Sequence, residues 1–184
     1  PARVEQIVAR AKELKGLTPE ETAVLLQTEE PDLLNLIYET ARDVKRKIYG
    51  NRLVLFAPLY ISNYCANNCL YCGFRRDNRD LNRVALTMDQ IAEEVKVLER
   101  EGHKRILMLC GEHPARSGID YFLEAVETVY ATKTEKGGEI RRINVEIAPL
   151  GIPEYRRLKE AKIGTYVLFQ ETYHKEGYET LHPT

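Results

Sequence analysis

Three of the four cysteines in this chain, Cys65, Cys69 and Cys72, fall within eight residues in the spacing Cys-x3-Cys-x2-Cys. Thiolates are soft ligands of the kind that iron–sulfur clusters and zinc prefer. A structural zinc site takes four ligands, usually from two separated pairs, and here a histidine would have to supply the fourth. A ferredoxin-type carrier takes four cysteines, whereas the fourth cysteine, Cys110, lies on a distant apolar run and is expected to be a buried thiol.

Three thiolates on a four-iron cluster leave one iron open. That position favours the binding of a small chelating ligand, by the same logic that leaves a vacant position in catalytic metal sites. Secreted disulfide frameworks are shorter and denser in cysteine than this chain. The cysteine spacing therefore predicts a metal or catalytic site in a reducing compartment.

Composition argues against several other classes of protein, namely nucleic-acid-binding, membrane-spanning and secreted proteins. A net charge of −1 gives no basic field over the chain, so we expect no nucleic-acid partner. No apolar run approaches the ~20 residues of a membrane span, and no secretory signal leads the chain. We therefore expect a cytoplasmic protein without a membrane partner.

The elements that must position the cysteines follow from capping signals and apolar periodicity. Residues 1–50 are expected to form helices, one of them starting with a capping box in which Thr18 is the N-cap and Glu21 its partner. Beyond them, apolar runs alternate with amphipathic segments. The expected strands are 52–62, 104–113, 141–150 and 163–174, and the expected helices between them are 86–102, 118–133 and 152–162.

This alternation predicts an α/β fold with a parallel sheet built from right-handed crossovers. About four βα units are present, whereas a closed (β/α)8 barrel needs eight. We therefore expect a helical N-terminal segment, 1–50, and the N-terminal half of a TIM-type barrel, 51–184, in a truncated chain. Half a barrel leaves a sheet edge open and a cavity incomplete, so the 184-residue chain alone is expected to have little activity.

Several motifs carry a resemblance to a known family. The stretch "FAPLYISNYCANNCLYCGF" places an aromatic residue, Tyr71, before the third cysteine and follows the first strand. In these features the chain resembles the radical S-adenosylmethionine (radical SAM) superfamily. "GEH" at 111–113 and "QETYH" at 170–174 are similar to its aromatic amino acid lyase branch. "CGFRRDN", "GEIRRINVEIAPL" and "GTYVLFQETYH" look most like the HydG family of tyrosine lyases, with the ThiH family next.

The resemblance implies a radical SAM tyrosine lyase that cleaves the Cα–Cβ bond of tyrosine to p-cresol and dehydroglycine, yielding carbon monoxide and cyanide for [FeFe]-hydrogenase. The first alternative is a ThiH-type lyase that supplies dehydroglycine for the thiazole of thiamine. The second, from another class, is a non-catalytic iron–sulfur or zinc scaffold.

The cofactors implied are a 4Fe–4S cluster and S-adenosylmethionine, with an auxiliary iron–sulfur cluster only in a further C-terminal part. The partners implied are L-tyrosine, an electron donor such as ferredoxin or flavodoxin, and other hydrogenase maturation proteins.

The resemblance also assigns roles to individual residues. Cys65, Cys69 and Cys72 would hold the cluster. The residues assigned to cofactor binding are Tyr71, Phe74, Gly111, Glu112 and Glu146, and those assigned to catalysis are Tyr60, Glu171 and His174.

Each assignment outside the cysteines has a structural alternative. The carboxylates at strand ends are the kind that assemble barrel active sites, or they form surface ion pairs. In the first strand, Phe56, Pro58, Tyr60 and Ser62 alternate on one side. Tyr60 either touches substrate there or is a core tyrosine with a satisfied hydroxyl, and His174 either shapes the substrate cavity or starts a helix.

The arginine-rich run after the third cysteine contains Arg75, Arg76, Arg79 and Arg83 among acidic residues. Without an aromatic stacking platform or a net basic field, it predicts a solvated loop over the cluster rather than a nucleic-acid contact.

Overall fold

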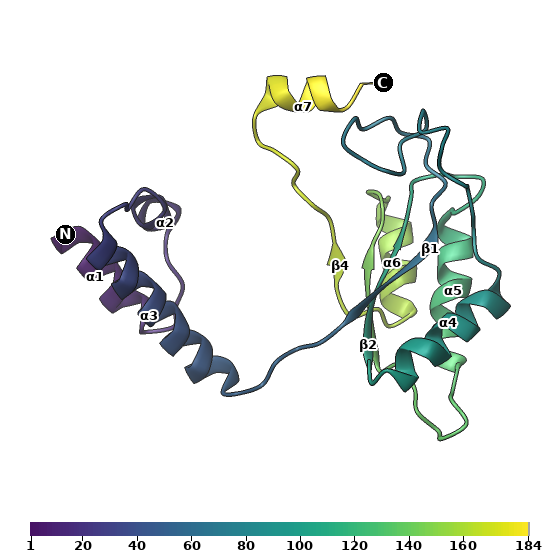
Figure 1. Cartoon of the computed structure of the whole chain (residues 1–184), viewed down its shortest axis with the longest axis horizontal. Coiled ribbons are helices and arrows are strands. Elements are labelled where there is room, and N and C mark those ends of the chain that lie inside the picture. Colours follow the sequence, from purple (N-terminus) through teal and green to yellow (C-terminus); the bar gives the residue numbers. More distant parts are fainter. Residues whose placement is uncertain (184) are drawn as a thin grey trace. The chain divides into compact units, whose positions relative to one another are not determined.

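The computed structural model describes residues 1–183, and the chain divides into two compact units, Pro1–Val54 and Leu55–Thr184 (Figure 1). The first unit contains helices α1 (Ala2–Ala11), α2 (Pro19–Leu26) and α3 (Pro31–Tyr49). The predicted capping box of α2 is confirmed, because the Glu21 amide donates to the Thr18 hydroxyl at 3.3 Å and the Thr18 amide donates to the Glu21 carboxylate at 2.9 Å. Across residues 1–183, none of the helices is both long enough and apolar enough to cross a membrane.

The second unit alternates strands with helices, as predicted. Its elements are β1 (Ala57–Ser62), α4 (Met88–Arg100), β2 (Arg105–Cys110), α5 (Ile119–Ala131), β3 (Arg142–Glu146), α6 (Ile152–Glu160), β4 (Tyr166–Val167) and α7 (Lys175–Leu181). The four strands form one parallel sheet in the order β1-β2-β3-β4. The predicted parallel sheet is therefore confirmed.

The core of this unit lies between one face of the sheet and helices α4, α5 and α6. Strand residues that point to these helices, such as Ile61, Ile106 and Ile143, are fully buried against Phe122 and Leu158. Side chains alternate across a strand, so the neighbouring residues point to the opposite face. The sheet therefore keeps one face for packing and leaves the other free for a site.

All four predicted strands are longer than the observed ones, and the first and last differ most. β1 begins at Ala57, which pairs with Ile106, and residues 52–55 would lie beyond the start of β2 at Arg105 in this register. β4 has only two residues, which pair with the last two residues of β3. Helix α7 occupies residues beyond the last predicted strand.

A β-bulge at the end of β1 turns the chain toward the cysteines. Tyr60 pairs with Leu109 and Ser62 pairs with Cys110, so β1 carries one extra residue at this point. A bulge shifts the alternation of side chains, and Ser62 is buried instead of lying on the exposed side with Pro58 and Tyr60. The prediction that Ser62 shares the side of Tyr60 is therefore wrong.

The start of the cysteine loop is held against the core by Tyr121 of α5. Its hydroxyl lies 2.9 Å from the Ile61 carbonyl and 2.8 Å from the Leu86 carbonyl, at the two points where the loop leaves and rejoins the sheet. Burial raises the pKa of the Tyr121 phenol to about 12, so the hydroxyl keeps its proton and remains a donor at neutral pH.

We predict that Tyr121→Phe lowers the free energy of unfolding by about 1–2 kcal/mol, because a buried carbonyl loses a hydrogen-bond donor. Urea unfolding followed by circular dichroism measures the change. The control is Tyr173→Phe, since Tyr173 is 91% exposed and its loss should change stability by less than about 0.5 kcal/mol. Equal effects of the two substitutions would contradict the role of Tyr121.

Candidate cofactor site at the carboxyl edge of the sheet

The three clustered cysteines lie on a loop between β1 and α4 that contains no helix. All three are free thiols and are partly exposed. The Cys72 amide donates to the Cys69 carbonyl at 3.0 Å and forms a tight turn between these two cysteines. The Phe74 amide donates to the Cys72 sulfur at 3.4 Å. The backbone therefore presents the thiols without help from regular secondary structure.

The loop is joined to the end of β2 by close backbone contacts. The Ala66 amide donates to the Glu112 carbonyl at 2.7 Å, and the Gly111 amide donates to the Ser62 carbonyl at 3.0 Å. A Cβ atom at position 111 would overlap the Tyr64 carbonyl. Gly111 is needed here because the cysteine loop passes directly over it.

The chemistry of the three thiols fits an iron–sulfur cluster. Partial burial, and then the charges of Cys72 and Cys65, raise the pKa of the Cys69 thiol, so the thiolates need a compensating cation. Within residues 1–183, no three His, Cys, Asp or Glu side chains converge closely enough to hold one metal ion. A four-iron cluster binds each cysteine at a different iron, so its ligands need not meet at one point.

A cavity of about 320 Å³ opens beside these cysteines at the carboxyl end of the sheet. Parallel βα folds assemble their active sites at this edge. Its lining combines Cys65 and Cys72 with residues from all four strands or their exits, namely Tyr60, Phe74, Leu109, Cys110, Gly111, Glu146, Ile147, Ala148, Leu168, Phe169 and Glu171. The structure therefore brings five of the predicted cofactor and catalytic residues to one cavity with two of the cysteines.

Two carboxylates give this cavity a preference for cations. Burial, and then the negative charge of Glu171, raise the pKa of Glu146 above its ordinary value. Such a pair of carboxylates is relieved by a bound ammonium group. Among the other lining residues, the rings of Tyr60 and Phe74 meet edge to face with centroids 5.7 Å apart.

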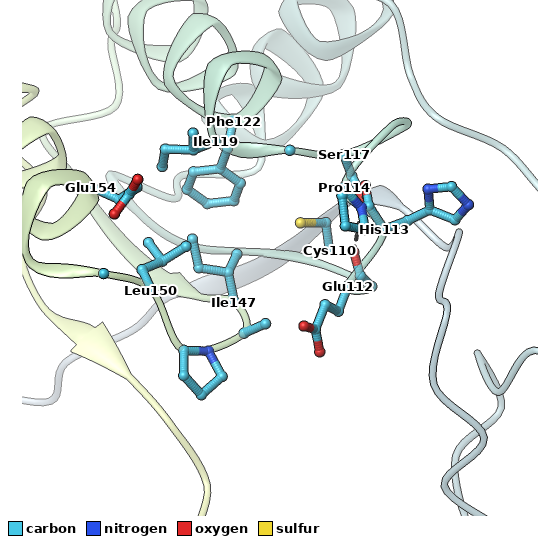
Figure 2. Close-up of a pocket in the computed structure, with 15 residues that line it drawn as sticks. Cys110, Glu112, His113, Pro114, Ser117, Ile119, Phe122, Ile147, Leu150 and Glu154 are labelled. Carbon is cyan, nitrogen blue, oxygen red and sulfur yellow. Dashed lines mark hydrogen bonds between the residues drawn. The ribbon is translucent and has the colours of Figure 1, made fainter. Parts of the chain in front are cut away.

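Glu112 lies apart from this group. Its carboxylate accepts a hydrogen bond from the Asn67 amide of the cysteine loop at 2.5 Å and lines a neighbouring cavity of about 570 Å³. Figure 2 shows this second cavity, with the Cys110 thiol and the Glu112 carboxylate pointing in different directions from the end of β2. Cys110 is partly buried rather than fully buried, and desolvation raises the pKa of its thiol to about 12, so it stays protonated at neutral pH.

Tyr71 and His174 make contacts with α7 and its ends. His174 is the N-cap of α7, where its Nδ1 accepts from the Gly177 amide at 3.0 Å, which is the helix-start alternative. The Tyr71 hydroxyl lies 2.6 Å from His182 Nε2, and His182 Nδ1 lies 2.8 Å from the Tyr178 carbonyl. Because a carbonyl only accepts, Nδ1 carries the proton and Nε2 accepts from Tyr71.

Sequence reasoning missed Asn67 and His182. Asn67 lies between two cysteines, and nothing in its position along the chain marks its bond to Glu112. His182 is 111 residues away from Tyr71 along the chain. No periodicity or spacing could have indicated either contact.

Comparison with known proteins identifies the family. The model of the radical SAM superfamily matches residues 59–184, which include the cysteine loop and all of the sheet except the first two residues of β1. This chain belongs to the radical SAM superfamily. The predicted resemblance to this superfamily is confirmed. Membership implies a 4Fe–4S cluster and S-adenosylmethionine as cofactors.

Solved structures and related enzymes show which members of the superfamily this chain is similar to. A crystal structure of HydG, described as a maturase of the [FeFe]-hydrogenase, is 51% identical, with a TM-score of 0.96 over all of this chain and 40% of its own. HydG from Carboxydothermus hydrogenoformans is 42% identical, with a TM-score of 0.85 over all of this chain and 42% of its own. The 2-iminoacetate synthase of Escherichia coli (strain K12) is 32% identical over 175 residues, or 95% of this chain and 44% of the enzyme.

These matches confirm the predicted fold as the N-terminal part of a radical SAM TIM-type barrel. The chain spans less than half the length of these relatives.

We predict that alanine substitution of Cys65, Cys69 or Cys72 each abolishes cluster binding by the radical SAM chain, because each thiolate holds a different iron. Iron content per chain after anaerobic reconstitution measures the loss. Cys110→Ala is the matched control and should keep the parent's iron content, since its half-buried thiol resists ionisation. Equal iron loss in Cys110→Ala would contradict the assignment of the three loop cysteines.

Proposed function

We propose that this chain is the cluster-binding part of a HydG-type tyrosine lyase, which cleaves the Cα–Cβ bond of L-tyrosine to p-cresol and dehydroglycine and yields carbon monoxide and cyanide for hydrogenase maturation. The observation that carries the proposal is the 51% identity to HydG over the whole chain, with a TM-score of 0.96. The activity, substrate and partners of the complete protein are part of this proposal, because the chain spans 40% of that HydG chain.

In this proposal, Cys65, Cys69 and Cys72 hold the 4Fe–4S cluster. When bound, the cluster and S-adenosylmethionine supply a 5′-deoxyadenosyl radical. The chain itself supplies orientation and excludes water, which is what a protein contributes when the cofactor carries the chemistry. The cavity supports this division of roles, because Leu168, Phe169 and other apolar side chains make up much of its lining.

The carboxylates at the strand ends orient charged groups. Burial and the negative charge of Glu171 raise the pKa of Glu146, and an ammonium group bound between the two carboxylates would favour the ionised form of Glu146. S-adenosylmethionine and tyrosine each carry an α-ammonium group. We therefore assign Glu146 to the cofactor and Glu171 to the substrate side of the cavity.

The remaining assignments concern two aromatic residues of the cavity, Tyr60 and Phe74, and the carboxylate of Glu112. Tyr60 projects from the exposed face of β1 into the cavity and is placed to contact the tyrosine substrate, with Phe74 packed against its ring. Glu112 is assigned to the methionyl amine by its position next to Gly111 in the sequence, although its carboxylate accepts from Asn67 and lines the neighbouring cavity. Tyr71 is assigned to the cofactor. His174 stays a predicted catalytic residue that shapes the substrate cavity, and its ring also caps the start of α7.

A second candidate, a ThiH-type lyase that releases dehydroglycine for thiazole synthesis, is favoured by the match to 2-iminoacetate synthase over 95% of the chain. Both candidates release p-cresol, and only the first yields carbon monoxide and cyanide. A cytoplasmic location, an electron donor of the ferredoxin or flavodoxin type, contact with other maturation proteins and an auxiliary cluster elsewhere in the complete protein belong to the first proposal.

We predict that the complete, anaerobically reconstituted protein converts tyrosine to p-cresol and carbon monoxide with S-adenosylmethionine and a reductant. Chromatography measures p-cresol, and a haem-protein trap measures carbon monoxide. Release of p-cresol without carbon monoxide would favour the ThiH-type reaction. Bound tetrahedral zinc, with no response to S-adenosylmethionine, would contradict both lyases and favour a scaffold.

We predict that Glu171→Gln lowers kcat/KM for tyrosine by about tenfold or more, or about 1.4 kcal/mol, because the charge that faces the substrate ammonium is lost. The matched control is Glu154→Gln, whose carboxylate lines the neighbouring cavity instead. An equal decrease in both variants would contradict the substrate role of Glu171.

A further inference from the structure

The guanidinium of Arg83 lies within the cysteine loop and donates to four backbone carbonyls. Nη1 lies 2.6 Å from the Asn63 oxygen and 2.8 Å from the Phe74 oxygen. Nη2 lies 2.6 Å from the Arg75 oxygen and 3.3 Å from the Asn78 oxygen. Each terminal nitrogen carries two hydrogens, so all four have an acceptor.

These carbonyls lie on both sides of the cysteines. Asn63 comes two residues before Cys65, and the other three acceptors follow Cys72 within six residues. One planar cation therefore ties the start of the cysteine segment to its end. The two ends cannot separate without breaking at least one of these bonds.

The backbone on either side of Arg83 is fixed by Asn63 in return. The side-chain Nδ2 of Asn63 donates to the Asn82 carbonyl at 2.8 Å, and its side-chain Oδ1 accepts from the backbone amide of Val84 at 2.7 Å. The Asn63 amide of the main chain also donates to the Val84 carbonyl at 3.0 Å. Arg83 is thus held at its backbone by the residue whose carbonyl its side chain binds.

The neighbouring arginines lack this arrangement. Arg75 donates to one carbonyl, that of Cys72, at 3.2 Å, and Arg76 pairs with the exposed Asp77 at 3.4 Å. Arg79 is exposed. Arg76 and Arg79 fit the predicted solvated loop, whereas Arg83 is partly buried inside it.

We propose that Arg83 is the positioning residue of the cysteine loop, which sets the separation of Cys65 and Cys72 before a cluster binds. Arginine suits the task because its charge is permanent and its planar fork reaches several oxygens at once, whereas lysine offers a single point of charge. The inference goes beyond the proposed lyase reaction, since it concerns the cluster that the family implies and holds for either lyase.

The test compares Arg83→Gln and Arg83→Lys with the parent in the complete protein, and Arg79→Gln is the control with the same charge change in the same loop. After anaerobic reconstitution, transfer of iron to a chelator should be about tenfold or more faster from Arg83→Gln than from the parent, and intermediate from Arg83→Lys. Arg79→Gln should match the parent. The electron paramagnetic resonance signal of the reduced cluster should broaden only in the Arg83 variants.

Hydrogen exchange of the cluster-free protein tests the same idea without iron. The amides of Ala66 and Arg76, which bond to Glu112 and Asn67, should exchange about tenfold faster in Arg83→Gln, while those of β2 and β3 keep the parent's rates. Unchanged exchange and iron retention in Arg83→Gln would overturn the proposal. If Arg83→Gln does not fold, parent-like behaviour of Arg83→Lys overturns it. Absence of a cluster from the parent would refute the cysteine assignment instead, and exchange would still decide the role of Arg83.

Discussion

Three cysteines must be held at fixed separations by a loop that has no helix to fix them, and the rest of the site depends on this constraint. Conformational freedom costs a flexible segment roughly 1–2 kcal/mol per residue when it is ordered. The loop meets that cost with hydrogen bonds to its backbone, from Arg83 within it and from the end of β2 beneath it.

One face of the sheet packs in the core and stabilises the fold, and the other face lines the candidate site. Ile61 and Ile106 pack against the helices, while Tyr60 on the other face is 54% exposed and lines the cavity. Parallel strands bring Gly111, Glu146 and the β4 exit to the same edge. The polar groups of the site are therefore positioned by hydrogen-bonded strands that are themselves fixed by the core.

Local patterns predicted most of the fold, because apolar period and caps act over a few residues. Helices α1 to α6 and the parallel order of the strands followed from such patterns, whereas α7 was not predicted. The alternation in β1 grouped Tyr60 with one side of the strand but left open whether that side is exposed. The extent of β1 did not, because it depends on where β2 begins. The cysteines were recognisable from spacing alone, whereas the bonds of Arg83, Asn67 and His182 depend on the folded path of the loop and carry no mark in the sequence.

The bulge in β1 connects the regular sheet to the folded path of the cysteine loop. An extra residue between Tyr60 and Ser62 buries the Ser62 side chain and directs its carbonyl to the Gly111 amide. The backbone at the end of the strand is therefore hydrogen-bonded to the residue after β2. The next residue, Asn63, then binds the backbone of Asn82 and Val84, on either side of Arg83. A regular strand would return Ser62 to the face of Tyr60 and shift Asn63 by one position. The geometry of the cysteines thus begins with an irregularity inside the sheet.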